Sequence, residues 1–143
     1  MDIRKANSRA WDWEADHGSA WARIESEETI EAARNGRPRI HITVERNVPE
    51  EWILPLKGRD VLCMGGGGGQ QTPVLAAFGC HVTTLDLSQR MISIDREALD
   101  RYGLDAELVC GDMSSMPFAP ASFDAVISPV SMNFIDDIEA VYA

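Results

Sequence analysis

The sequence predicts an α/β domain built on a parallel β-sheet with helices on its faces. Between residues 59 and 128, short apolar runs alternate with helix-like segments, and each run ends in glycine or a polar residue. Strands that alternate with helices form parallel sheets whose faces are covered. We therefore expect a doubly wound sheet with about four core strands, preceded by a helical N-terminal segment.

Composition indicates an ordinary globular protein. The 143 residues are enough for one domain with its own core, and apolar residues make up 45% of them. No stretch approaches the roughly 20 apolar residues of a membrane span, and the first residues lack the apolar run of a signal peptide. The sequence therefore predicts a cytoplasmic protein without a membrane partner.

The charge and the cysteines argue against several kinds of partner. The formal net charge is −10, and a field of this sign repels the phosphate backbone of nucleic acids. The cysteines, Cys63, Cys80 and Cys110, are odd in number and form no C-x-x-C pair. We therefore expect no nucleic-acid partner, no disulfide framework and no bound metal.

Residues 1–58 are expected to form a helical lid or cap, and residues 59–143 the core. Helix is expected over 4–35, with Ser26 as a cap and Gly36 just past the end. Residues 40–44 alternate in polarity, which indicates a short strand. The segment between Pro49 and Pro55 is expected to be irregular.

The core should contain four strands and two main helices. Each expected strand is short and apolar, and the second is rich in β-branched residues. Ser88 is expected to cap the longer helix and Gly103 to end it. The expected strands cover 60–64, 81–85, 106–109 and 124–128, and the helices cover 73–78 and 88–102.

The strongest signal is the run of five glycines at 65–69, between the first strand and a helix. Glycine lets a ligand approach the backbone, and the helix N-terminus offers N–H groups to its polar atoms. The alternative, a flexible linker, does not suit a position between a buried strand and a helix. The dinucleotide spacing G-x-G-x-x-G fails because Gln70 and Gln71 occupy the third glycine position, and no lysine follows as in a P-loop. The spacing G-x-G-x-G suits a nucleoside cofactor without a pyrophosphate.

Two aspartates follow the second and third strands. At Asp86, a carboxylate can accept hydrogen bonds from both ribose hydroxyls of a nucleoside. At Asp112, it can accept from the exocyclic amine of adenine while Met113 packs against the ring. The alternatives are helix capping for Asp86, where Ser88 is the better cap, and a surface turn for Asp112. Ligands bind at the carboxyl ends of parallel strands, so both aspartates indicate one site.

Together these motifs resemble class I S-adenosylmethionine-dependent methyltransferases, and most of all the type 11 small-molecule group. The resemblance covers residues 59–137, and its specificity comes from several motifs in the family's order. Asn7, Trp11 and the helix end at 32–36 are similar to one bacterial subgroup. The motifs lie at 61–69, 68–73, 85–88, 111–113, 117–118, 123–126 and 129–131, with Phe134 after them.

The resemblance implies a Rossmann-like fold and S-adenosylmethionine as the cofactor. The glycine run would line the methionine moiety, Asp86 the ribose, and Asp112 with Met113 the adenine. Residues 128–130 would border the reactive methyl group. The expected cofactor-binding residues are Gly65, Gly66, Gly67, Gly69, Gln70, Asp86, Leu87, Ser88, Asp112, Met113, Ser128 and Pro129.

Two further parts of the chain would complete this site. Gln70 and Gln71 would contact the carboxylate or ammonium of the cofactor. The first helix, with Trp11 and Trp13, would fold over the site as a lid. For both tryptophans, packing against the sheet edge is the alternative.

Two departures from the family pattern stand out. Cys63 occupies the place where the family usually has an acid that helps orient the cofactor, although the bacterial subgroup tolerates cysteine there. The family also continues beyond the fourth strand, so the resemblance implies C-terminal truncation. The fourth strand would then be an exposed apolar edge, and we expect self-association through it.

The function implied is methyl transfer to an unidentified small molecule. Such a transfer needs mainly positioning and exclusion of water, and no catalytic base stands out in the sequence. The alternative is a truncated, non-catalytic module that binds S-adenosylmethionine or S-adenosylhomocysteine. A third reading, an NAD-type oxidoreductase, is disfavoured by the glycine spacing.

Overall fold

A four-stranded parallel sheet forms the centre of the protein in the computed structural model, which describes residues 1–128 and 131–142. The strand order β3-β2-β1-β4 places the fourth strand at one edge. Every strand pairing is parallel, so the predicted α/β class with a four-stranded sheet is confirmed. The strands are β1 (Asp60–Met64), β2 (His81–Asp86), β3 (Glu107–Cys110) and β4 (Ala125–Ile127).

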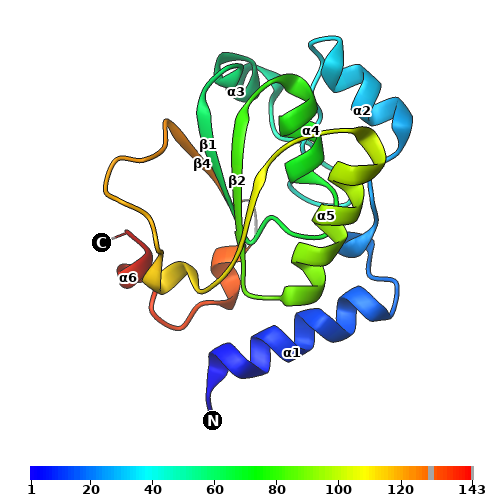
Figure 1. The fold of residues 1–143 in the computed structure, drawn as a ribbon. Coiled ribbons are helices and arrows are strands. Elements are labelled where there is room, and N and C mark those ends of the chain that lie inside the picture. Colours follow the sequence, from blue (N-terminus) through cyan, green and yellow to red (C-terminus); the bar gives the residue numbers. More distant parts are fainter. Residues whose placement is uncertain (129–130, 143) are drawn as a thin grey trace.

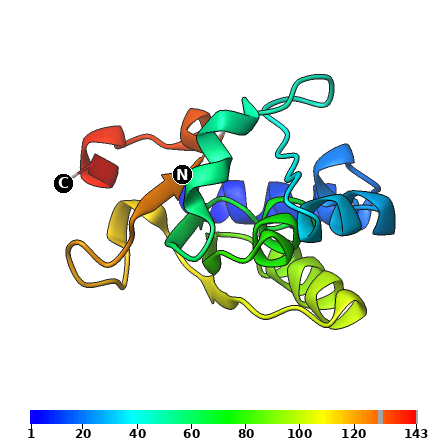
Figure 2. The same cartoon turned by 90° about the horizontal axis from the view of Figure 1, so that it is seen from above.

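Side chains of β1 alternate between the two faces of the sheet and belong to two separate cores. Val61 and Cys63 lie in one core, whereas Leu62 and Met64 lie in the other, as the two-residue period of a strand requires. Figures 1 and 2 both show α5 and α6 on opposite sides of the molecule. The first core is covered by α2 (Glu27–Arg34), α4 (Gln71–Phe78) and α5 (Gln89–Tyr102), and the second by the 3-10 helix η3 (Met113–Ser115) and α6 (Ile138–Tyr142).

The ends of the core helices follow from local chemistry. As predicted, Ser88 caps α5 by accepting a hydrogen bond from the Met91 N–H, and Gly103 ends the helix with a φ of 64°. Helix α4 begins at Gln71, two residues before the predicted start at residue 73. Pro73 fits inside the first turn, where a backbone N–H has no partner within the helix.

The N-terminal third departs most from the predicted elements. The helical stretch expected over 4–35 consists of three pieces, α1 (Ile3–Asp16), the 3-10 helix η1 (Ala20–Ala22) and α2, which Ser26 caps as predicted. The chain breaks after α1 at Gly18, whose φ is 75°. This left-handed backbone conformation cannot continue a right-handed helix.

The segment from 40 to 56 also differs from its prediction. Residues 40–44 form no strand, and only an isolated antiparallel bridge joins His41 to Asn47. Ile40 is buried in the first core while Val44 is exposed at a turn, so the alternation of polarity does not mark a strand. The stretch expected to be irregular contains a short helix, α3 (Glu50–Ile53), and the 3-10 helix η2 (Leu54–Leu56).

The N-terminal segment lies across the carboxyl ends of the strands. Figure 1 shows α1 below the sheet, next to the start of α5. The chain then passes over the glycine loop, which we define as residues 65–69, and the Glu25 N–H donates to the Gly69 carbonyl at 2.9 Å. A Cβ atom on Gly68 would overlap the Trp21 carbonyl. The glycines therefore make room for the protein's own backbone.

Among the described residues, no helix combines the length and the apolar character needed to span a membrane.

We predict that Gly68→Ala destabilises the fold more than Gly79→Ala does. Both glycines have a strongly positive φ, 110° and 103°, but only the new Cβ at Gly68 meets backbone at close range, since the nearest atoms at Gly79 are 3.6 Å away. We expect a loss of about 1–2 kcal/mol for Gly79→Ala from the backbone conformation alone, and a larger loss for Gly68→Ala. Urea unfolding measures both, and equal losses would contradict the close packing of the N-terminal segment.

Candidate cofactor-binding site

A pocket opens at the carboxyl ends of the strands, between the glycine loop and α1. The ends of β1, β2 and β3 and the segment after β4 contribute to its wall, as ligand binding in an open α/β sheet requires. Residues far apart in the chain thus meet at one place. Of the expected site residues, those that line the pocket are Gly65, Gly67, Gln70, Asp86, Leu87, Asp112 and Met113.

Four other expected residues lie behind the pocket wall rather than on it, and Pro129 lies outside the described residues. Ser88 is fully buried and is occupied as the cap of α5. The Ser128 hydroxyl lies 2.5 Å from the Ser131 hydroxyl, and Ser131 does line the pocket. Ser128 therefore supports the wall indirectly. The four residues are Gly66, Gly69, Ser88 and Ser128.

The amides of the glycine loop are already used by the protein. Two of them donate to carbonyl groups, those of Leu85 and Met91, and two donate to buried carboxylates, those of Asp86 and Asp95. The loop is thus a preformed frame, so a ligand meets a fixed surface. The Gly65 and Gly68 N–H groups donate to the carbonyls of Leu85 and Met91, respectively. The Gly67 and Gly69 N–H groups donate to the carboxylates of Asp86 and Asp95.

Asp86 stands at the centre of this edge of the sheet. Its Oδ2 accepts from the Gly67 N–H and its Oδ1 from the Ser88 N–H, each at 2.9 Å. Burial raises the pKa of its carboxyl, the two amides act in the opposite direction, and the Asp12 charge raises it further. Each oxygen has a second lone pair, so the carboxylate can still accept from ligand hydroxyls.

One carboxylate oxygen of Asp112 accepts hydrogen bonds within its own turn, and the other lies close to Arg4 of α1. Its Oδ1 accepts from the Ser114 N–H and hydroxyl, which is the turn arrangement named above as the alternative. Its Oδ2 lies 3.2 Å from Arg4 Nε, an ion pair without the alignment of a hydrogen bond. A ligand could therefore compete with Arg4 for this oxygen.

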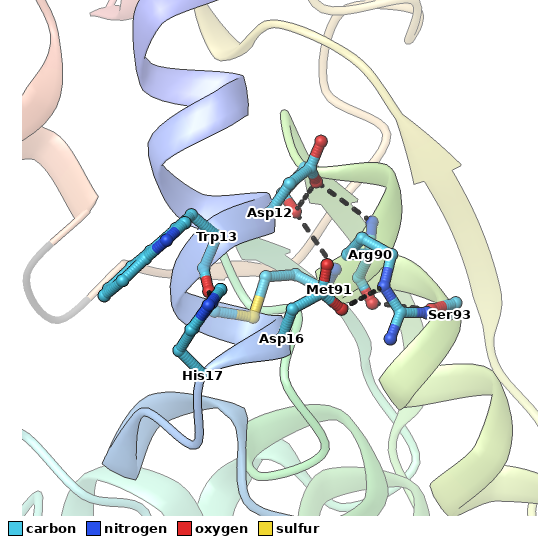
Figure 3. A network of polar contacts seen from close by, with 8 residues as sticks. Asp12, Trp13, Asp16, His17, Arg90, Met91 and Ser93 are labelled. Carbon is cyan, nitrogen blue, oxygen red and sulfur yellow. Dashed lines mark hydrogen bonds and ion pairs between the residues drawn. The ribbon is translucent and has the colours of Figure 1, made fainter.

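A network of polar contacts fastens α1 to the start of α5 (Figure 3). Asp12 Oδ1 accepts from the Ser88 hydroxyl at 2.5 Å and from the Arg90 N–H at 3.2 Å. Asp16 Oδ1 accepts from Arg90 Nε at 2.8 Å. Because free N–H groups at a helix start attract negative charge, the two aspartates suit this end of α5.

The two tryptophans of α1 have different surroundings. Trp11 lines the pocket and meets the Phe134 ring edge-on at 5.3 Å. Trp13 stacks on the His17 ring at 4.0 Å and is 57% exposed, and Figure 3 shows this pair on the side of α1 opposite Asp12 and Asp16. Only Trp11 is placed to contact a ligand.

Comparison with known proteins gives this arrangement a family. A family model of a methyltransferase domain (type 11) matches residues 62–143. The chain belongs to the class I S-adenosylmethionine-dependent methyltransferases. It is 39% identical over 137 residues to the uncharacterized methyltransferase YbaJ of Bacillus subtilis (strain 168), a match that covers 95% of this chain and 54% of that protein. The chain thus spans about half the length of this curated relative.

Two solved structures are similar to this methyltransferase chain. An S-adenosylmethionine-dependent methyltransferase from Clostridium acetobutylicum ATCC 824 is 28% identical with a TM-score of 0.53, over 62% of this chain and 37% of that one. A protein solved in work on the conversion of a disulfide bond into a thioacetal group during echinomycin biosynthesis is 27% identical with a TM-score of 0.64, over 94% and 52% of the two chains. The predicted family and the Rossmann-like fold are therefore confirmed, and the family's cofactor is S-adenosylmethionine.

The structure adds pocket residues of the methyltransferase chain that sequence reasoning missed. Arg4 and Asn7 line the pocket from the same face of α1 as Trp11, which was expected over the site, and the spacing of three and four residues is the signal that could have found them. Ser131, after β4, also lines the pocket and donates to the Met64 carbonyl at 2.7 Å. Nothing in its sequence context marks this role, because it depends on β4 lying beside β1.

The two glutamines after the glycine loop have separate roles. Gln70 Nε2 donates to the Ala20 carbonyl at 2.5 Å and to the Arg23 carbonyl at 3.2 Å, so it ties the N-terminal segment to the loop. Gln71 lines the pocket, and its Oε1 is buried without a hydrogen-bond partner among the described residues. An acceptor left in this state suits a donor on a ligand.

We predict that Asp12→Ala loosens α1 and that Asp16→Ala does not. Asp12 is partly buried and accepts two hydrogen bonds at the start of α5, whereas the Asp16–Arg90 pair is about half exposed on both sides. Loss of a charged acceptor costs about 1.5–3 kcal/mol, against about 1 kcal/mol or less for an exposed pair. Amide hydrogen exchange over residues 3–16 should therefore accelerate about tenfold or more in Asp12→Ala. Equal exchange in the two variants would contradict this attachment.

Proposed function

We propose that this chain binds S-adenosylmethionine at the pocket and serves methyl transfer to a small molecule. The observation that carries the proposal is the position of Asp86. Its buried carboxylate ends β2, contacts the glycine loop and borders the pocket, where it can receive the ribose hydroxyls.

The charge of the site supports this cofactor over a dinucleotide. Asp86, Asp112 and Asp136 line the pocket, with Arg4 as the single cation among the described lining residues. S-adenosylmethionine carries a positive sulfonium and a positive ammonium group, whereas a dinucleotide carries negative phosphates. An acidic pocket attracts the first and repels the second.

The residues present also fit the amino-acid end of the cofactor. The unpartnered Oε1 of Gln71 is an acceptor at the pocket wall, and an ammonium group is a donor only. Gly65 and Gly67 also line the pocket, where they present backbone without side chains. We propose Gln71 as a contact of the cofactor's ammonium group.

The proposed reaction asks the protein for positioning. Bound S-adenosylmethionine supplies a methyl group on a positively charged sulfur, so the leaving group of an in-line displacement is already activated. Trp11 and Phe134 cover the pocket from α1 and from the segment after β4, where they would exclude water. We assign no catalytic base, because deprotonation is needed only for some acceptors.

Several wider features belong to this proposal. We propose residues 1–58 as a lid or cap and residues 59–143 as the cofactor-binding core. The pocket residues of α1 support the lid at the start of this segment, whereas α2 within it packs on the first core. The net charge of −10 supports a small-molecule acceptor over a nucleic acid. A cytoplasmic location without a membrane partner is proposed from composition. Family membership favours the enzyme over a non-catalytic binding module.

Calorimetric titration of the chain with S-adenosylmethionine, S-adenosylhomocysteine and NADH tests the binding. We expect both sulfur nucleosides to bind and NADH not to. Asp86→Ala should weaken binding about tenfold or more, because a hydrogen bond to a charged group is worth about 1.5–3 kcal/mol. Asp100→Ala is the matched control, since Asp100 is exposed on α5.

The proposal fails if the chain gives a cooperative thermal transition yet binds neither sulfur nucleoside. The proposed role of Asp86 fails if Asp86→Ala still unfolds cooperatively and binds with wild-type affinity.

We also propose that the chain self-associates through β4. This strand is at the edge of the sheet, and Val126 within it is 53% exposed. Edge strands with apolar side chains pair with other chains. Sedimentation should give a dimer or larger species for the wild type and a monomer for Val126→Lys, with Val44→Lys, at another exposed valine, behaving as the wild type. A monomeric wild type would exclude this association.

A further inference from the structure

We propose that Asp95, on α5, is a positioning residue that holds the glycine loop in its cofactor-binding shape. The proposal rests on the proposed function, because this loop is the part of the pocket that would receive the cofactor. Asp95 has an exposed fraction of 0% and is not part of the pocket wall. It therefore acts on the loop from behind and does not touch a ligand.

Both carboxylate oxygens of Asp95 are engaged by the loop and the helix that follows it. Oδ1 accepts from the Gly69 N–H at 2.7 Å, and Oδ2 accepts from the Thr72 hydroxyl at 2.7 Å. Thr72 is in the first turn of α4 and its hydroxyl also lies 3.3 Å from the Gly66 carbonyl. One carboxylate thus holds the last residue of the loop and the first turn of α4.

This carboxylate has no balancing cation. Among the described residues, no Lys, Arg or His forms an ion pair with it. The titratable groups that face it are Cys63 from β1 and Asp86 from the end of β2, and neither is a cation. A buried charge kept without a cation lowers stability, and residues that do so are concentrated at functional sites.

A count of hydroxyl protons shows how the charge is supported. The Thr72 and Thr84 hydroxyl oxygens lie 2.5 Å apart. Each hydroxyl has one proton to donate. If Thr72 donates to the ionised Asp95, Thr84 must donate to Thr72. The two hydroxyl protons are thus aligned from β2 through α4 toward the carboxylate.

The same geometry explains the departure at position 63. The family usually has an acid there, but in this chain Asp95 already supplies a carboxylate from the α5 side. A second carboxylate on β1 would face Asp95 in a dry site, where like charges disfavour each other's ionisation. Burial raises the pKa of the Cys63 thiol, so a neutral group occupies the position instead.

The test compares Asp95→Ala with Asp95→Asn. In Asp95→Ala the Gly69 N–H loses its acceptor, and S-adenosylhomocysteine should bind about tenfold more weakly or worse by calorimetry. Asp95→Asn should retain most of the affinity, because its amide oxygen can accept from Gly69 and its NH₂ group can donate to Thr72. Exchange of the Gly69 amide should be faster in Asp95→Ala than in Asp95→Asn, with or without ligand. Asp100→Asn, exposed on the same helix, should match the wild type.

The pH dependence of affinity and stability distinguishes an ionised Asp95 from a side chain that only fills space. Burial raises the pKa of Asp95 to about 7, so its ionised, stronger acceptor form becomes dominant as pH rises through that value. Wild-type affinity should therefore contain a rise near pH 7 that is missing in Asp95→Asn. Stability should change in the opposite sense. Because the folded-state pKa lies above the unfolded value of about 3.9, the wild type should lose Tm relative to Asp95→Asn as pH rises toward 7.

Several outcomes separate this inference from the proposed function. A folded wild type that does not bind S-adenosylhomocysteine overturns the proposed function, while Gly69 exchange still tests the hold of Asp95 on the loop. Wild-type binding with unchanged affinity and exchange in Asp95→Ala overturns the role of Asp95 alone. If Asp95→Ala does not fold, coincident pH profiles of the wild type and Asp95→Asn overturn it.

Discussion

The arrangement of the site depends on how closely the backbone of the glycine loop approaches its neighbours. On one side the Trp21 carbonyl would overlap a Cβ at Gly68, and on the other a Cβ at Gly67 would be 2.7 Å from the Met91 Cβ. The N-terminal segment, α5 and β1 can meet at the end of the sheet only because these positions lack side chains. The pocket exists where these elements converge.

Close backbone approach brings polar groups into the interior, and two aspartates satisfy them. Asp86 and Asp95 accept the amides of Gly67 and Gly69, so the charges that burial penalises are offset by hydrogen bonds from the loop. The two residues differ in what remains available to a ligand. Asp86 borders the pocket, whereas Asp95 is enclosed behind it, which separates ligand contact from support of the loop.

Contacts between α1 and the start of α5 fix the position of α1, which contributes residues to the pocket wall. Asp12 accepts from Ser88, which also caps α5, so one hydroxyl serves both the helix and its contact with α1. Arg4 and Trp11 are thereby placed over the pocket two turns apart on α1. A ligand that displaced Arg4 from Asp112 would act on the same helix.

The core elements could be predicted because their signals are local. The strands of the sheet, the cap at Ser88 and the helix end at Gly103 follow from polarity patterns and from the chemistry of single residues. The order β3-β2-β1-β4 also fits the alternation of strands and helices. The N-terminal elements were harder to predict. The break after α1 has a local signal, since Gly18 lies just past the C-cap His17 in a left-handed conformation. The turn after Ile40 depends on the packing of Ile40 in the core, which weak local preferences do not report.

The sequence by itself determined the fold class, the family, the glycine loop and the two aspartates after β2 and β3, because spacing along the chain is enough to place groups at the ends of parallel strands. Only the tertiary structure decided that Arg4 and Ser131 reach the same pocket, that the loop amides are already paired, and that Asp95 is buried beneath the loop. These features depend on distances between segments far apart in the chain. No residue type or local period encodes such a distance, since it arises only when the helices pack on the sheet.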